Sequence, residues 1–188
     1  KTEVLNLLQT NANIADKTGR QVFAKIPGVF VYDMDGPGNQ INIATRGLDP
    51  HRGWEFNMRK DGIITNSDMY GYPASHYSMP LESIDHIELV RGTGALQYGA
   101  QFGGMLNYVS KIGDSTKKIS FESINTAGSF NLLSTYNAIG GKAGKFRYYA
   151  YFHKKIRDGY RKVEHTHAEA QSIAIAYEPS GDFSIRVE

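Results

Sequence analysis

Residues 90–111, VRGTGALQYGAQFGGMLNYVSK, hold five glycines within the fourteen residues that end at Gly104. Two interpretations fit such a stretch: a phosphate-binding loop, whose backbone N–H groups cradle an anion, or a tightly turned segment. A dinucleotide-binding motif requires G-x-G-x-x-G, but Gly92 and Gly94 are followed by Gln97. A Walker loop requires Gly-Lys-Ser/Thr, and this stretch has no lysine before Gly104. The glycines are therefore predicted to serve tight turns and close backbone approaches.

The composition indicates a folded protein and excludes some classes of partner. Of 188 residues, 40% are hydrophobic and 21% are charged, which excludes a disordered tail. The net charge of +2 is too small to indicate a nucleic-acid surface, and the lack of cysteine excludes disulfides and thiolate metal sites. No apolar run has the length of a membrane-spanning helix, whereas membrane-spanning strands leave only a weak hydropathy signal. The opening residues, KTEVLNLLQTNANI, indicate a chain cut from something longer.

The first part of the chain mixes short elements with polar and glycine-rich loops. The apolar residues of segment 2–9 predict a short helix, with Thr2 as its N-cap. Asp61-Gly62 is predicted to form a type I′ turn between two strands, and a helical turn precedes the strand that ends at Val90. The other expected strands are residues 29–32, a half-buried strand at 41–46, and a strand at 105–111.

After Lys111 the pattern changes to longer alternating strands. Phe183, Ile185 and Val187 alternate with polar residues, as expected of a strand with one apolar face. Short GGKAG and EPSGD turns and a longer loop, IRDGYRKVEH, are typical of an up-and-down barrel or a meander. Too few strands are present to close a barrel, so either the chain stops partway or the strands form a small sheet. The expected strands are residues 117–127, 130–139, 145–155, 166–177 and 182–188.

Four motifs follow one another along the first part of the chain: IPGV (26–29), I-x-I-x-x-R-G (41–47), the Asp61-Gly62 pair, and MPLESIDHIELVRGTGALQYGAQFGGMLNYVSK (79–111). Their order strongly resembles the plug domain of TonB-dependent outer-membrane receptors, in which a small α+β domain lies inside a barrel of about 22 strands. The resemblance covers residues 1–112. One departure is Thr93, where the family often has proline.

The resemblance implies a two-part fold. Residues 1–112 are expected to form an α+β plug domain with a small mixed sheet. Residues 113–188 are expected to be the first antiparallel β-strands of an incomplete transmembrane β-barrel. This architecture implies a location in the cell outer membrane of a Gram-negative bacterium.

Two arginine-glycine pairs, Arg46-Gly47 and Arg91-Gly92, correspond to family positions that lock the plug to the barrel. The family's arginines pair with glutamates of the barrel wall, and here those partners would lie beyond residue 188. A guanidinium offers planar, bidentate pairing to a carboxylate. The alternative is that both are ordinary surface arginines.

The resemblance places three loops at the outer apex of the plug, at residues 33–40, 48–54 and 66–77. Arginine and histidine suit an anionic chelate, and aromatic rings offer rigid surface to an organic ligand. The alternative is that the loop tyrosines pack against the lumen wall. The expected ligand-binding residues are His51, Arg52, Trp54, Tyr70 and Tyr72.

Neither a resident metal nor a catalytic site is expected. His165 and His167, with Glu164 and Glu169 nearby, could suggest a metal site, but their segment is predicted to be a solvated, charged loop. The chain has no cysteine and no G-x-S-x-G motif, so nucleophilic catalysis has no support. The protein is therefore expected to have no cofactor and not to be an enzyme.

The expected function is uptake of an iron chelate as transported ligand. Residues 47–62, GLDPHRGWEFNMRKDG, look closest to receptors for ferric citrate and similar siderophores. The resemblance implies energy coupling to the TonB–ExbB–ExbD complex through an N-terminal TonB box that would precede Lys1. Uptake of a glycan, cobalamin or haem is the alternative within the family, and a soluble β-rich binding module is the alternative outside it. Exposed apolar alternation after residue 117 would favour the membrane barrel.

Overall fold

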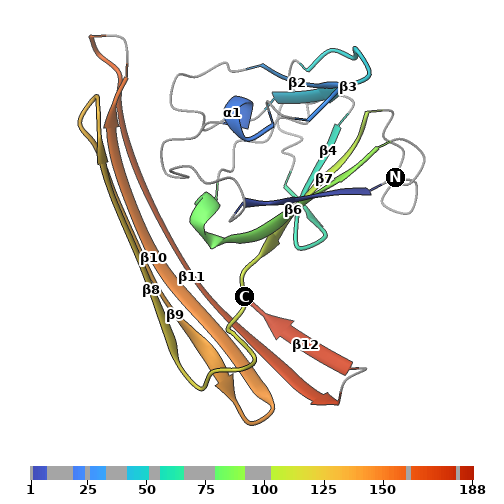
Figure 1. Ribbon diagram of the computed structural model, residues 1–188, viewed down its shortest axis with the longest axis vertical. Helices are drawn as coiled ribbons and strands as arrows, with labels where there is room; N and C mark the ends of the chain where they lie inside the picture. The colour runs from blue at the N-terminus through green and yellow to red at the C-terminus, as the bar shows by residue number, and fades with distance from the viewer. Residues whose placement is uncertain are drawn as a thin grey trace. The chain divides into compact units, whose positions relative to one another are not determined.

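The computed structural model describes residues 2–7, 19–23, 26–32, 42–50, 56–65, 79–91, 103–159, 162–180 and 183–188. The chain divides into two compact units, Lys1–Ser110 and Lys111–Glu188. Each unit is built around its own main sheet, and Figure 1 labels most of their helices and strands.

Within its described residues, the first unit is built on a five-stranded mixed sheet in the order β1-β6-β7-β4-β5. The pairing of β4 with β7 is parallel and the other pairings are antiparallel. A second, two-stranded sheet pairs β2 with β3. The elements are β1 (Thr2–Asn6), α1 (Gly19–Phe23), β2 (Val29–Tyr32), β3 (Asn42–Thr45), β4 (Phe56–Lys60), β5 (Ile63–Ile64), a 3-10 helix (Leu81–Ser83), β6 (Ile84–Val90) and β7 (Gly104–Ser110).

Apolar side chains from the mixed sheet, α1 and the β2–β3 pair form one core. Ile87 and Leu89 of β6 and Leu106 of β7 are fully buried. Phe23 of α1 and Ile43 of β3 belong to the same cluster. Burial of such side chains is the main favourable term in folding, so this core holds the short elements together.

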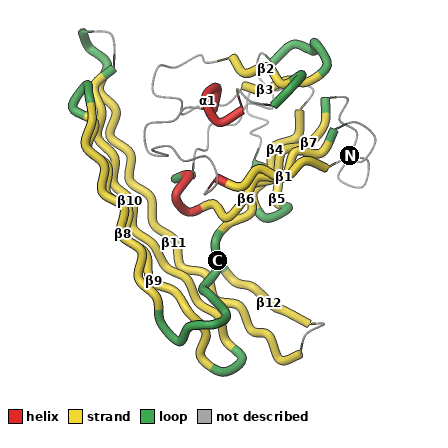
Figure 2. The backbone as a smooth tube through the Cα atoms, in the orientation of Figure 1, coloured by secondary structure: helices red, strands yellow, loops and turns green. Residues whose placement is uncertain are grey.

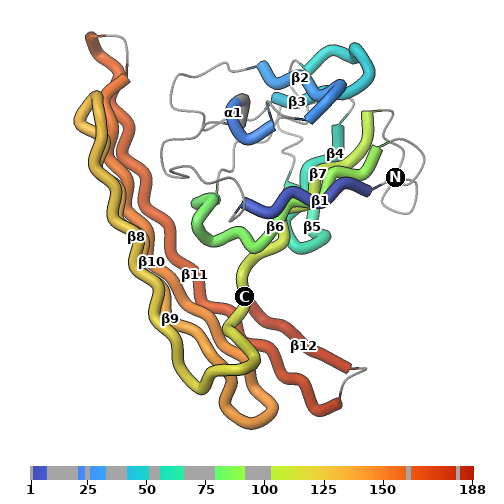
Figure 3. The backbone as a smooth tube through the Cα atoms, in the orientation of Figure 1, coloured from blue at the N-terminus to red at the C-terminus, as the bar shows by residue number. Residues whose placement is uncertain are grey.

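The structure corrects two sequence predictions in this unit. Residues 2–9 were expected to begin a helix, but Thr2–Asn6 is strand β1, which pairs with β6 along its whole length. Figure 3 shows the blue β1 running beside the green β6. Tertiary pairing with an edge overrides a weak local helical preference, so Thr2 is not an N-cap. The strand expected to be half-buried, β3, is buried at all four positions.

The predicted turn at Asp61-Gly62 is confirmed. Asp61 has φ of 49° and Gly62 has φ of 81°, the pair of positive values that a type I′ turn requires. The Asp61 carboxylate accepts hydrogen bonds from the backbone N–H and hydroxyl of Ser110, at 2.9 and 2.7 Å. The amide of Asn107 accepts from the Gly62 N–H at 2.9 Å, which further ties the turn to β7.

The second unit is an antiparallel sheet, with order β12-β11-β10-β9-β8 among its described residues. Strands dominate this unit, as the yellow tube of Figure 2 shows. The strands are β8 (Ser120–Gly128), β9 (Leu132–Ala143), β10 (Phe146–Asp158), β11 (His165–Ser180) and β12 (Phe183–Val187). All five lie where the sequence predicted strands, and most are longer than expected.

The longer strands change two connections. Most of the predicted GGKAG turn belongs to β9, so the β9–β10 connection is the tight pair Gly144-Lys145, with φ of 61° at Gly144. The predicted charged loop is also shorter, because β11 begins at His165. His165 and His167 therefore lie in a strand, where ladder pairing with β10 continues to Asp158.

Candidate functional site

The glycine-rich motifs meet at one end of the mixed sheet. Strand β6 ends at Val90 and the antiparallel β7 starts at Gly104, so both face this end. Gly104 has φ of 121°, and a Cβ added to it would overlap the carbonyl oxygen of Val90. The hydroxyl of Thr45, at the end of β3, donates to the carbonyl oxygen of Gly103. At Gly104, glycine serves close backbone approach, as predicted.

Arg91 follows β6 at this end and forms an ion pair inside the first unit. Its Nη2 lies 2.8 Å from Oε2 of Glu3, a residue of the neighbouring β1. About a quarter of the Arg91 side chain is exposed. Its Nε is buried and has no hydrogen-bond partner among the described residues. The guanidinium therefore keeps a donor for a further acceptor.

Arg46 lies in the turn after β3 and is exposed. Its φ of 61° and the φ of 75° at Gly47 turn the chain sharply. The Arg46 backbone N–H donates to the carbonyl oxygen of Gly28 at 3.4 Å, and a Cβ at Gly28 would lie 3.8 Å from Nη1 of Arg91. The Ile-Pro-Gly turn is therefore hydrogen-bonded to the Arg46-Gly47 motif and lies near the Arg91 guanidinium. The pairing of these arginines with barrel glutamates stays a prediction.

The five residues expected to bind ligand lie outside the described residues: His51, Arg52, Trp54, Tyr70 and Tyr72. The described chain on either side of them is well anchored. Phe56 follows the first group and is paired with Gly104 of β7. Thr65 precedes the second group, and its N–H donates to the carbonyl oxygen of Met58 at 2.9 Å. Their role as a ligand site stays a prediction.

A polar chain crosses the middle of the mixed sheet. The Asn107 amide donates to the carboxylate of Glu88 at 2.8 Å and accepts from Gly62. Beside it, the phenol of Tyr108 is buried and has no hydrogen-bond partner among the described residues. Burial raises the pKa of the Tyr108 phenol, so this group stays neutral. No local sequence pattern marks these hydrogen bonds or the Glu3–Arg91 pair, because the residues that form them are far apart in sequence.

The sheet of the second unit has one face rich in exposed apolar side chains, here called the apolar face. Phe121, Ile173 and Ile185 are 77%, 68% and 50% exposed on this face. They alternate along β8, β11 and β12 with side chains of the opposite face. Near the tight Gly144-Lys145 turn, the rings of Phe146 and Tyr177 lie 4.9 Å apart on the apolar face.

The opposite face carries ion pairs and hydrogen bonds and is here called the ion-paired face. Lys111 lies 2.7 Å from the Glu122 carboxylate, which also accepts a hydrogen bond from Tyr149 at 3.3 Å. The hydroxyls of Tyr149 and Tyr136 lie 2.6 Å apart. Arg147 pairs with Glu178 at 3.1 Å, across β10 and β11. This alternation of apolar and polar faces is typical of a barrel wall with lipid on one side.

The expectation of no metal site concerns His165 and His167. His165 lies against Asp158, and His167 lies 3.1 Å from Glu169. Among the described residues, no group of three or more His, Cys, Asp or Glu side chains could hold a metal ion.

No helix in the described ranges of the chain is both long and apolar enough to cross a membrane.

These features define the class of protein. A small α+β domain with a mixed sheet is followed by antiparallel strands of an incomplete barrel wall, which confirms the predicted fold class. A family model described as the TonB-dependent receptor plug domain matches residues 7–105, more than half of the chain. The chain belongs to the TonB-dependent receptor plug domain family. Members of this family are transporters and receptors rather than enzymes, as expected.

Relatives and solved structures agree with this assignment. The vitamin B12 transporter BtuB of Vibrio vulnificus (strain CMCP6) is 25% identical over 97 residues, which are 51% of this chain and 15% of that protein. The pyoverdine outer membrane receptor FpvA from Pseudomonas aeruginosa PAO1 superposes with a TM-score of 0.77 at 18% identity, covering 99% of this chain and 26% of that one. The siderophore receptor PirA from Acinetobacter baumannii gives 0.67 at 17% identity, covering 96% and 29%. The copper transporter OprC gives 0.73 at 16% identity, covering 98% and 30%.

The chain is much shorter than these proteins. It spans 15% of the curated relative and between 26% and 30% of the three solved receptors. At such identities the solved structures establish the fold alone.

Proposed function

We propose that this chain is part of a TonB-dependent receptor in the outer membrane of a Gram-negative bacterium, and that the receptor takes up an iron chelate, ferric citrate or another siderophore. Residues 1–112 are assigned to the plug domain and residues 113–188 to the first strands of the barrel. The observation that carries the proposal is a plug-family unit followed directly by a sheet with one apolar and one ion-paired face.

The apolar face supports the membrane location. A soluble β-rich binding module would have to leave Phe121, Ile173 and Val187 in water at 77%, 68% and 68% exposure. Lipid covers such a face without further protein. The aromatic pair Phe146–Tyr177 sits near a tight turn, as in the aromatic girdles of outer-membrane barrels.

The iron chelate is proposed from the chemistry of the apical loops. Arg52 and His51 can supply charge-assisted hydrogen bonds to the carboxylates of an anionic chelate. Trp54, Tyr70 and Tyr72 can supply flat apolar surface to its organic part. Cobalamin is the second candidate, favoured by the relative that is named a vitamin B12 transporter. The binding test described next also includes glycans and haem.

Energy coupling follows from the family. A TonB box on the N-terminal side of Lys1 would engage TonB of the TonB–ExbB–ExbD complex. Force on that segment would act first on β1, which is an edge strand of the mixed sheet. The contacts nearest to that force are the β1–β6 ladder and the Glu3–Arg91 ion pair.

The test is cargo binding by the full-length receptor in detergent. Ferric citrate, ferric siderophores, haem, cobalamin and oligosaccharides are titrated against the wild type, Arg52→Ala and Tyr70→Ala. We expect an iron chelate to bind, and each substitution to weaken it about tenfold or more, the effect of losing one good contact. Lys118→Ala is the control, because it removes an exposed cation outside the apical loops.

The outcomes separate the parts of the proposal. Binding of cobalamin or a glycan alone would keep the receptor and remove the iron chelate. Binding of a chelate that neither substitution weakens would move the ligand contacts to other parts of the receptor.

A further inference from the structure

We propose that residues 111–119, here called the strap, are the fixed end of the plug during transport, and that Lys111, Gly113 and Arg147 are positioning residues for uptake. In the proposed function, force enters at the other end of the plug, through β1. The inference rests on that function and adds to it the place at which force-driven movement stops.

Glycine lets the strap backbone lie directly on the backbone of the second unit's sheet. A Cβ added to Gly113 would overlap the carbonyl oxygen of Tyr148 and the backbone of Gly141, and a Cβ on Gly141 would overlap the carbonyl oxygen of Lys118. A Cβ on Gly140 would lie 3.1 Å from the Cα of Gly113. Backbone atoms cannot rotate away as the end of a side chain can, so a side chain at Gly113 would push the strap off the sheet.

Hydrogen bonds from the sheet hold the strap along its length. Each acceptor is a backbone carbonyl oxygen of the strap, and each donor belongs to β9 or β10. The pairs are Arg147 Nε with Gly113 at 2.9 Å, the Lys142 N–H with Lys117 at 2.8 Å, and the Tyr148 hydroxyl with Lys118 at 2.8 Å. Arg147 is itself held by Glu178 of β11, 3.1 Å away. The strap is therefore tied to β9 and β10, and β11 fixes the Arg147 side chain.

An ion pair fixes the strap where it begins. Lys111 directly follows Ser110, the last residue of β7, and its side chain is only 16% exposed. Its Nζ lies 2.7 and 3.0 Å from the two carboxylate oxygens of Glu122, and 5.9 Å from the centre of the Tyr136 ring. Separating a partly buried pair of this kind is unfavourable, because each charge is left without its partner and away from water.

The first and last strands of the plug sheet are held differently. Among the described residues, β1 has β6 as its one neighbour, whereas β7 lies between β6 and β4. A pull from the N-terminal side would peel β1 from β6 one residue pair at a time. Strand β7 is held on both sides and continues into the strap. Movement that starts at β1 is therefore expected to stop at Lys111.

A fixed strap has a consequence for transport. Because the strap stays on the wall, the plug can be rearranged from its N-terminal side without leaving the barrel, and it can return when the force ends. Release of the strap would let the same force displace more of the plug, so the opening would become wider than the cargo needs. We therefore expect variants with a weakened strap to leak only under force.

A single-molecule pull on the full-length receptor in a bilayer measures the fixed end directly. Force is applied through Lys1→Cys. We expect the wild type to extend by about 110 residues, roughly 360–400 Å at about 3.3–3.6 Å per residue, before a step of higher resistance. Gly113→Ala and Lys111→Met should each lower the force of that step at least twofold, whereas Lys111→Arg, which keeps the cation, should stay near wild type.

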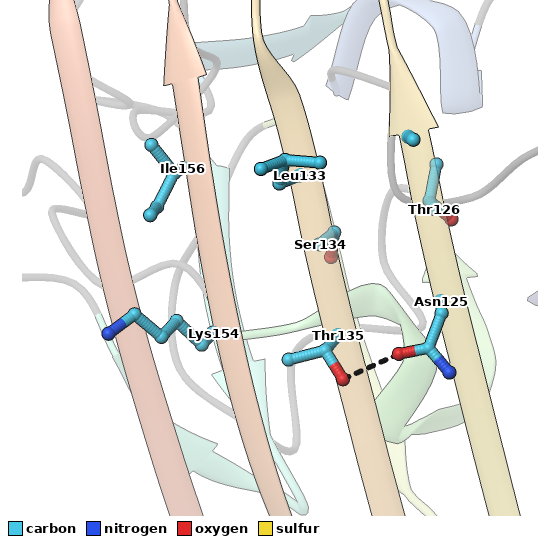
Figure 4. Close-up of a pocket in the computed structure, with 8 residues that line it drawn as sticks. Asn125, Thr126, Leu133, Ser134, Thr135, Lys154 and Ile156 are labelled. Atoms are coloured by element: carbon cyan, nitrogen blue, oxygen red, sulfur yellow. Dashed lines mark hydrogen bonds between the residues drawn. The ribbon is translucent and has the colours of Figure 1, made fainter.

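Two control variants lie on the same sheet, away from the strap. Gly128→Ala makes the same change as Gly113→Ala, but its Cβ would meet the flexible Leu132 side chain at 3.2 Å instead of backbone. Thr135→Val removes the 2.7 Å hydrogen bond to Asn125 on the apolar face, which Figure 4 shows as a dashed line. Both variants should keep the wild-type force.

A second measurement separates a positioning role from a general loss of stability. Cells that carry each variant are exposed to vancomycin, a bulky antibiotic that the outer membrane excludes, with and without TonB. We expect Gly113→Ala and Lys111→Met to raise sensitivity at least fourfold with TonB and to leave it unchanged without TonB. Migration in unheated gels reports whether each receptor is folded, and Lys111→Met carries the test if Gly113→Ala is not.

Three results would overturn the inference: a wild-type force step in the folded strap variants, the same fall in either control, or leakage that is absent or does not depend on TonB. Failure of the proposed function looks different, because the wild-type receptor would then be missing from the outer-membrane fraction.

Discussion

At Gly104, both the backbone conformation and a close backbone approach disfavour any side chain. Its φ of 121° is in a region that only glycine adopts readily, and a Cβ there would overlap the carbonyl oxygen of Val90. Gly47 also has a positive φ, 75°, but a Cβ there would meet nothing within 4 Å. A side chain at Gly47 would therefore strain the backbone only, whereas a side chain at Gly104 would strain the backbone and also overlap a neighbouring strand.

Gly104→Ala is expected to lower the free energy of unfolding of the plug by about 2–4 kcal/mol, because strain and overlap add. Gly47→Ala, with strain alone, should cost about 1 kcal/mol. Urea denaturation of the full-length receptor in detergent, followed by proteolysis of the plug, measures both. An equal loss of unfolding free energy in the two variants would mean that β6 moves away from β7 at Val90 without destabilising the plug.

Among the elements, β1 combines a structural and a mechanical role. Among the described residues it is an edge strand, and it pairs with β6 over its whole length, from Thr2 with Val90 to Asn6 with His86. The Glu3–Arg91 ion pair adds a contact at the end where β6 stops. An edge strand has one neighbour only, so it can leave its sheet without disturbing the other pairings.

A disulfide between β1 and β6 tests whether β1 must detach during uptake. Val4 and Glu88 are directly paired, and the chain has no cysteine of its own, so Val4→Cys/Glu88→Cys should form a single bridge. We expect cargo binding to be unchanged and TonB-dependent uptake by cells to fall at least tenfold, with recovery after reduction. The single-cysteine variants are the controls. Full uptake in the oxidised double variant would show that β1 stays paired during transport.

At the scale of the whole molecule, the two units bury apolar surface in different ways. The first packs Phe23, Ile43 and Leu106 into a closed core of its own. The second exposes large apolar side chains on one face and forms ion pairs on the other. The second unit therefore needs a further apolar environment, which the proposed bilayer supplies.

Ile173→Lys tests that environment. At the middle of a bilayer a lysine on a barrel's lipid face costs about 2–4 kcal/mol, whereas an exposed surface substitution in water costs within about 0.5 kcal/mol. Refolding of the full-length receptor into vesicles, followed by gel mobility, measures the loss. Gln171→Lys is the matched control, because it lies two residues along the same face of β11, closer to the Lys154–Glu169 ion pair. Equal, small effects of both would favour the soluble module.

Local patterns in the sequence were sufficient to predict the family, the Asp61-Gly62 turn and the alternating strands of the second unit. Each depends on residues close together in the chain, such as Phe183, Ile185 and Val187, whose spacing alone places them on one face. The arginine-glycine motifs were also recognised, but not the partner of Arg91. Glu3 lies 88 residues away, and no local pattern marks it.

The sequence by itself determined that this chain is a plug-type domain followed by wall strands, because motif order and period-two alternation are properties of the chain alone. Only the tertiary structure decided that β1 is a strand and that β3 is buried at every position. It also decided which residues pair across the second sheet, such as Lys154 with Glu169. The physical reason is that each of these depends on which strands become neighbours. Strand register is set by long-range pairing, and a residue's own neighbours in sequence do not specify it.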